Sequence, residues 1–283
     1  MSWFQGMKGK KIRLMAGVLS LVLFISGGVF FGISQKSDLT VRAEGTKAKE
    51  LQMEESSLAV SQPSVALPVI SGAKNGKKVA IDAGHQLHAN SALEPIGPGA
   101  KTKKAKVAGG CTGAATRVPE YKFTLRLAKK LEKELKSRGY EVYMIRTKNN
   151  VNISNKQRAR RANKSGADIY IRLHGDSSAS SSVIGASGLY PSKRNKYVGK
   201  LSAKSLKLTK AILKSYCKKT GIRNRGAVVR DDLTGTNWSK IPVTLIECGF
   251  MSNKAEDRKL QNASFQKKMA KGIADGIDGY FGF

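Results

Sequence analysis

Beyond residue 75, four short and mainly apolar runs lie at residues 79–81, 140–145, 169–173 and 242–246. Runs of this length and composition predict β-strands. The run at 242–246 is almost entirely apolar, which is typical of a strand buried on both faces near the centre of a parallel sheet.

Between these runs the apolar residues follow a helical spacing. A helix is predicted to begin at Pro119 and Glu120 and to end before Gly139. Its apolar stripe recurs at every fourth position, at Phe123, Leu127, Leu131 and Leu135.

Three further helices complete the pattern. Ser154 and Gln157 form a capping-box signal for a short helix that ends at Gly166. A basic amphipathic helix is predicted at 197–217, and a last helix carries apolar residues from 265 to 281. The alternation predicts an α/β fold, a single domain with a mostly parallel central sheet flanked by helices.

The N-terminal residues carry a targeting pattern. Lys8, Lys10, Lys11 and Arg13 precede an uncharged run of 22 residues, 14–35, which is long enough to span a bilayer and is oriented for export. We expect a signal-anchor or signal peptide at 1–37, a flexible linker at 38–75 and the folded domain at 76–283. The length of the run favours an anchor, whereas Val41-Arg42-Ala43 leaves cleavage open.

Charge and cysteine content narrow the class of protein. The chain has 51 Lys and Arg against 20 Asp and Glu, a net charge of +31, and 40% of its residues are hydrophobic, which excludes a disordered composition. Cys111, Cys217 and Cys248 are too few and too scattered for a disulfide framework or a cysteine-based zinc module. Cys248 is interpreted as a small packing residue, and a Cys111–Cys217 pair is not expected.

Three strands each end on a residue capable of metal or acid–base chemistry. His85 follows the first run, His174 follows the third, and Glu247 follows the fourth. In open α/β sheets ligands bind at the carboxyl ends of the strands. A single histidine is often only structural, but two of the chain's three histidines share this placement.

Two imidazoles suggest zinc, and a catalytic zinc needs a third protein ligand. Glu120, at the start of a helix, is the best candidate, although a carboxylate there also complements the helix dipole. Asp82 and Glu94 compete with Glu120, and His88 competes with His85.

The segments VAIDAGHQ, Pro119-Glu120, IRLHGDSS and LIECGFMSN resemble the zinc-dependent N-acetylmuramoyl-L-alanine amidases, which are peptidoglycan hydrolases. The resemblance implies that His85, Glu120 and His174 bind one Zn²⁺ ion and that Glu247 is the catalytic acid/base. Residues 76–283 would then be the catalytic domain. The sequence departs from the family at Gly175-Asp176, where a small residue and Asn are usual, and at Cys248, where Thr is usual.

By this resemblance the chain hydrolyses the amide bond between N-acetylmuramic acid and L-alanine, by a zinc-activated water with Glu247 as general acid/base. The alternatives are a zinc peptidase or carboxypeptidase acting on stem peptides, and a non-catalytic polyanion- or wall-binding protein. The Gly- and Lys-rich stretch at 86–118 is interpreted as a loop able to gate the site.

The net positive charge of the predicted folded domain indicates which binding partners to expect. From residue 76 onward there are 42 basic and 15 acidic residues, a balance of +27. For an exported monomer whose substrate is peptidoglycan, this charge favours anionic wall polymers or lipid head groups over any specific nucleic acid. We expect a bacterial protein outside the cytoplasm, either membrane-anchored or secreted to the wall.

Overall fold

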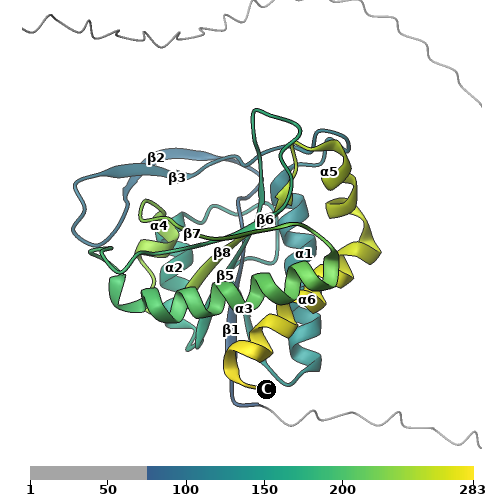
Figure 1. Cartoon of the computed structure of the whole chain (residues 1–283). Coiled ribbons are helices and arrows are strands. Elements are labelled where there is room, and N and C mark those ends of the chain that lie inside the picture. Colours follow the sequence, from purple (N-terminus) through teal and green to yellow (C-terminus); the bar gives the residue numbers. More distant parts are fainter. Residues whose placement is uncertain (1–74) are drawn as a thin grey trace, which may run out of the picture. The chain divides into compact units, whose positions relative to one another are not determined.

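The computed structural model describes residues 75–283 (Figure 1). The predicted anchor at 1–37, and all but the last residue of the predicted linker at 38–75, lie outside the described residues. Within 75–283, no helix combines the length and apolar composition needed to cross a membrane.

A six-stranded sheet organises the described residues, in the order β4-β1-β5-β8-β6-β7. The first four strands in this order are parallel to one another, whereas β6 is antiparallel to β8 and parallel to β7. The strands are β1 (Lys78–Ala83), β4 (Glu141–Met144), β5 (Ile169–Asp176), β6 (Ala186–Tyr190), β7 (Asn224–Val229) and β8 (Val243–Phe250). A separate antiparallel hairpin pairs β2 (Asn90–Pro95) with β3 (Lys103–Val107).

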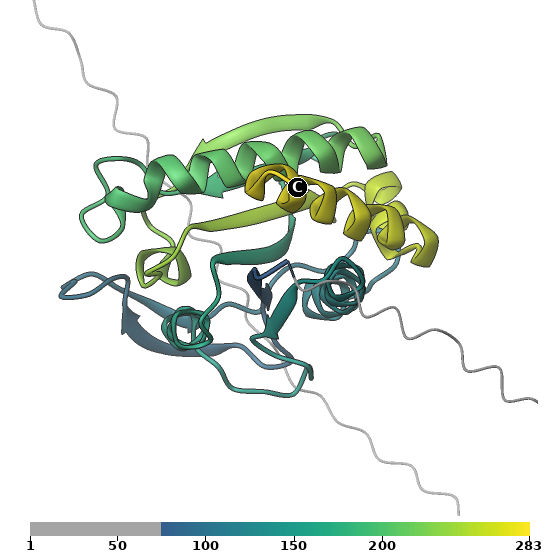
Figure 2. The same cartoon turned by 90° about the horizontal axis from the view of Figure 1, so that it is seen from below.

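Helices cover both faces of this sheet (Figure 2). They are α1 (Glu120–Ser137), α2 (Asn155–Lys164), α3 (Ser202–Thr220), α4 (Thr234–Asn237), α5 (Lys254–Gln261) and α6 (Ala263–Phe281), with a 3₁₀ turn at Gly199–Leu201. Helices α1 and α3 pack on the strands of one face and α6 packs on both of them, while α2 lies on the other face beside α4. The larger core cluster lies under α1, α3 and α6, and a smaller one lies under α2.

The α/β fold with its mostly parallel sheet is confirmed. All four predicted strands are present, and the strand predicted to be central, β8, lies inside the sheet between β5 and β6. The predicted stripe on α1 is fully buried, and α2 has the expected capping box between Ser154 and Gln157.

Several elements were missed or misplaced. Strands β6 and β7 were not predicted, and the predicted loop at 86–118 contains the β2–β3 hairpin. The helix predicted at 197–217 begins later, at Ser202. The backbone N–H groups of Tyr197 and Val198 donate to the side chain of Asn195, which holds a turn before the 3₁₀ segment.

Candidate metal centre

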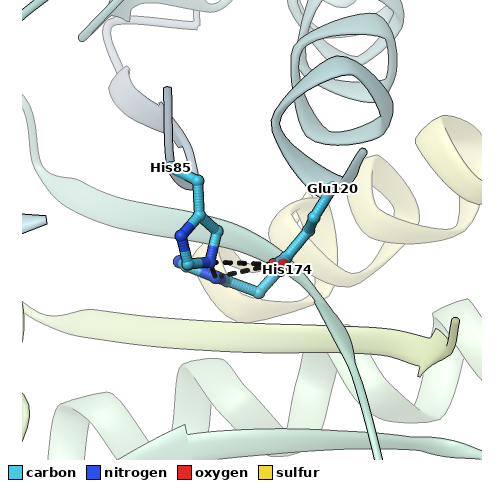
Figure 3. A group of neighbouring side chains, drawn as sticks. All are labelled: His85, Glu120 and His174. Atoms are coloured by element: carbon cyan, nitrogen blue, oxygen red, sulfur yellow. Dashed lines mark hydrogen bonds and ion pairs between the residues drawn. The ribbon is translucent and has the colours of Figure 1, made fainter. Parts of the chain in front are cut away.

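The sheet brings three polar side chains together at the carboxyl ends of adjacent strands. His85 follows β1 by two residues, His174 lies near the end of β5, and Glu120 is the first residue of α1. Figure 3 shows the three side chains converging from these elements. They form a group whose ligand atoms all lie within 4.8 Å of one another.

The spacing of these atoms fits a zinc ion. His85 Nε2, His174 Nδ1 and Glu120 Oε1 form a triangle in which every edge is 3.1 Å. Tetrahedral zinc with bonds of 2.0–2.1 Å to nitrogen and oxygen separates its ligand atoms by about 3.3 Å. Two imidazoles and one carboxylate are also a common ligand set for catalytic zinc, with a fourth position left open.

His85 is held in position by both its ring and its backbone. Its Nδ1 lies 2.8 Å from the carbonyl oxygen of Ala108, so Nδ1–H donates there and the lone pair of Nε2 faces the triangle. The residue adopts a left-handed φ of 59°, a conformation that costs a non-glycine residue about 1 kcal/mol or more. The Arg158 guanidinium donates to its carbonyl oxygen at 2.9 Å and stabilises this turn.

Glu120 is 3% exposed, and both its oxygens are engaged. The backbone N–H of Gly175 donates to Oε1 at 3.0 Å, and that of Cys111 donates to Oε2 at 2.9 Å. Burial alone would raise the pKa of Glu120, but hydrogen bonds to His174 and His85 hold it well below the usual value. Glu120 therefore stays an anionic ligand.

His174 is buried against a glycine that leaves it room. Burial lowers the pKa of His174 to about 4, so at neutral pH the ring is uncharged, as a metal ligand must be. Its buried Nε2 has no hydrogen-bond partner among the described residues, so neither ring nitrogen is hydrogen-bonded to a group outside the site. A Cβ on Gly84 would overlap the ring, so a larger residue there would displace His174.

The competing candidates lie outside the triangle. Asp82 is fully buried and accepts hydrogen bonds from Arg158 and Arg172 at 2.7 and 3.1 Å. Burial would raise the pKa of Asp82, but the two guanidinium groups hold it well below its usual value. Glu94 accepts a hydrogen bond from the backbone N–H of Lys156, and His88 is exposed.

Glu247 lies on β8 directly beside His174 on β5, at paired positions of the parallel ladder. Its Oε2 is buried and, among the described residues, has no hydrogen-bond partner, nor does its carboxylate form a salt bridge. Burial, and then the charges of Glu120 and Asp176, raise the pKa of Glu247 well above its usual value. An unsatisfied buried carboxylate is costly, which favours a functional role over a structural one.

The cysteines supply no nucleophile. Cys111, Cys217 and Cys248 are all free. Cys248 is buried in the larger core cluster, as expected of a packing residue. Burial and the charge of Glu120 raise the pKa of Cys111, which keeps that thiol protonated.

Residues that support the ligands were not identified from the sequence. Arg146 donates to the carbonyl oxygens of Ala83 and Gly84 and so fixes the chain just before His85. Asp257 accepts from the backbone N–H groups of Ala115 and Thr116 and fixes the loop that leads to Glu120. The sequence held one signal for such a residue: Asp82 lies within an apolar strand, and a buried charge must have a partner.

Comparisons with known proteins identify the family of the folded domain. The family model described as N-acetylmuramoyl-L-alanine amidase matches residues 79–279. N-acetylmuramoyl-L-alanine amidase LytC of Bacillus subtilis (strain 168) is 27% identical over 162 residues, which are 57% of this chain and 31% of that protein. The chain spans less than two-thirds of the length of the curated relatives it matches.

Several solved structures share the fold. The catalytic domain of CwlV, an N-acetylmuramoyl-L-alanine amidase from Bacillus (Paenibacillus) polymyxa var. colistinus, is 28% identical with a TM-score of 0.58, covering 73% of this chain and 98% of that one. The N-acetylmuramyl-L-alanine amidase Ami1 of Mycobacterium smegmatis is 24% identical with a TM-score of 0.67, covering 74% and 99%.

Proposed function

Because this chain belongs to the N-acetylmuramoyl-L-alanine amidase family, we propose that it hydrolyses the amide bond between N-acetylmuramic acid and L-alanine in peptidoglycan. The observation that carries the proposal is the pairing of two features at one sheet edge. A triangle of His85, Glu120 and His174 has the spacing of zinc ligands, and the unpartnered carboxylate of Glu247 lies on the strand next to His174.

His85, Glu120 and His174 would hold one Zn²⁺ ion. When bound, the ion would polarise the amide carbonyl and lower the pKa of a water molecule toward neutrality. The roles of the protein groups follow from their surroundings. Glu120 is anionic, and an imidazole binds a metal through a neutral nitrogen, so the three ligands together would offer one negative charge and two neutral donors.

Glu247 is the group we assign to proton transfer. As the general base it takes a proton from the attacking water, and as the general acid it delivers that proton to the departing amine of L-alanine. A raised pKa suits this role, because the carboxylate is then a stronger base toward the water than an ordinary glutamate.

The substrate implies a location. Peptidoglycan lies outside the cytoplasm, so we propose an extracytoplasmic bacterial protein whose apolar run at 14–35 attaches it to the membrane. Residues 76–283 then form the catalytic unit and 38–75 the linker. The excess of 42 basic over 15 acidic residues from residue 76 onward would attract the chain to anionic wall components.

Digestion of purified peptidoglycan tests the proposal. The full chain, loaded with zinc, is expected to release stem peptides that begin with a free L-Ala amino group and to leave glycan strands without peptides, both identified by mass spectrometry. Cleavage within the stem peptide would identify a peptidase instead. Wall binding without any cleavage by the zinc-loaded chain would favour the non-catalytic alternative.

A further inference from the structure

A cavity lies away from the metal centre. This cavity of about 980 Å³ opens between α2, α4 and the residues before β8, and its lining includes Trp238 and Tyr197. Figure 1 shows α4 beside α2, next to the β2–β3 hairpin. Lys240, on its wall, lies three residues before β8 begins and seven residues before Glu247, which corresponds to roughly 20 Å at the rise of an extended chain.

The lining of this cavity is strongly basic. Its charged residues are Arg160, Arg161, Lys164, Lys200 and Lys240, and none of the described lining residues is acidic. All five are exposed, and none forms a salt bridge with a carboxylate in the described part of the chain. The positive potential of the cavity is therefore left for a ligand.

Trp238, on the wall of the cavity, is held in place by its neighbours. The indole Nε1–H of Trp238 donates to the carbonyl oxygen of Pro95 at 2.9 Å, and Lys156 Nζ lies 4.5 Å from the ring centroid. The Asn163 side chain bonds both the carbonyl oxygen of Trp238 and the backbone N–H of Lys240. Binding a ligand here would cost little ordering entropy, because the ring is already fixed.

We propose that this cavity binds an anionic wall polymer built of phosphodiester-linked sugar or polyol units. Lysine and arginine groups suit phosphate oxygens, and Arg offers two parallel donors to each phosphate. Trp238 and Tyr197 line the cavity beside these cations and add apolar ring surface for the carbon skeleton between successive phosphates. Charge and shape thus both match a polymer that alternates anionic and apolar parts.

This site does not depend on the metal centre. The cavity shares none of its lining residues with the proposed zinc ligands or with Glu247. It would hold the chain on the wall beside its substrate. Failure of polymer binding would therefore leave the proposed amidase activity untouched, and the reverse also holds.

Tryptophan fluorescence allows a direct test. The chain has two tryptophans, Trp3 and Trp238, so Trp3→Phe in the full chain, kept in mild detergent, makes Trp238 the sole emitter. The probe is a glycosylated poly(glycerol phosphate). We expect a saturable change in Trp238 emission and an affinity that falls with salt by about 0.7 logarithmic units per phosphate contact for each tenfold rise in salt.

Two matched double variants distinguish binding in the cavity from non-specific attraction to the positive charge of the chain. Arg161→Gln with Lys240→Gln removes two cations from the cavity and should weaken polymer binding roughly tenfold and reduce the salt slope by about 1.4. Lys267→Gln with Lys271→Gln removes two exposed cations from α6 and should change binding less than twofold. Both double variants should keep wild-type hydrolysis of peptidoglycan freed of anionic polymer.

Three results would overturn the proposal. One is an equal loss of affinity in the two double variants, and another is polymer binding that leaves Trp238 emission unchanged. The third is binding of phosphatidylglycerol vesicles, or of a single-stranded oligonucleotide, that depends on Arg161 and Lys240 as strongly as polymer binding does. Either form of that third result would make the cavity a general phosphate site.

Discussion

Replacing Gly84 with alanine tests the placement of the His174 ring. The added Cβ would lie 2.4 to 2.7 Å from three atoms of that ring, whereas ordinary contact begins at 3.4 Å. The ring or the strand end must therefore move by about 1 Å, while a zinc site tolerates only about 0.2 Å in its bond lengths. The backbone of Gly84 does not lie in the left-handed region, so alanine meets no conformational barrier there.

We expect Gly84→Ala to weaken zinc binding 10- to 100-fold, the usual effect of disturbing the surroundings of a ligand. This corresponds to about 1.4–2.7 kcal/mol. Competition with a chromophoric chelator measures the affinity. Gly279→Ala is the control, since a Cβ on Gly279 meets nothing within 4 Å and should leave zinc affinity unchanged.

A double variant tests whether the clash with the His174 ring causes the effect of Gly84→Ala. In a His174→Ala background the ring is absent, so Gly84→Ala should no longer reduce the free energy of unfolding of the metal-free chain. Chemical denaturation of the four members of this cycle gives the coupling between the two positions. Wild-type zinc affinity in Gly84→Ala, or a destabilisation that persists without the ring, would refute the reasoning.

Three other predictions follow from the site and its support. Glu247→Gln should keep zinc and lower the hydrolysis rate 10²- to 10⁴-fold, and near-wild-type turnover would exclude Glu247 as the acid/base. Arg158→Met leaves Asp82 buried with one partner fewer and should reduce the free energy of unfolding by about 3–5 kcal/mol, measured by urea denaturation. The folded pKa of His174 is about 4 against an ordinary 6.5, so the unfolded chain binds the proton first and the metal-free chain should lose stability as pH falls from 6.5 to 4. The His174→Gln variant should lose less stability over the same range, and an identical pH profile would contradict the shift.

The sequence predicted the elements that carry strong periodicity. The stripe on α1 and the apolar runs of β1, β5 and β8 are buried as expected because their patterns match their geometry. Strands β6 and β7 were not predicted, since Ser187 and Gly188 interrupt the apolar residues of β6 and β7 is an edge strand with an exposed Arg225. The β2–β3 hairpin is largely polar and exposed, so it lacked any burial signal.

For the site, too, residues marked by a local sequence pattern could be predicted and residues that act through long-range contacts could not. The ligands are recognisable because strand ends and a helix start place His85, His174 and Glu120 at one edge. Their supports are not, because Asp257 lies 142 residues from the N–H of Ala115 to which it bonds, and no local pattern encodes so distant a pair. Arg158 likewise reaches Asp82 across 76 residues.

The most direct measurement combines metal content with product identity. Zinc per chain is determined on the full-length protein, and the same sample digests peptidoglycan before and after treatment with a chelator. We predict one zinc per chain, peptides beginning with free L-Ala, loss of activity with the chelator, and recovery on adding zinc. Undiminished release of those peptides from a chain shown to hold no metal would contradict the assignment of His85, Glu120 and His174.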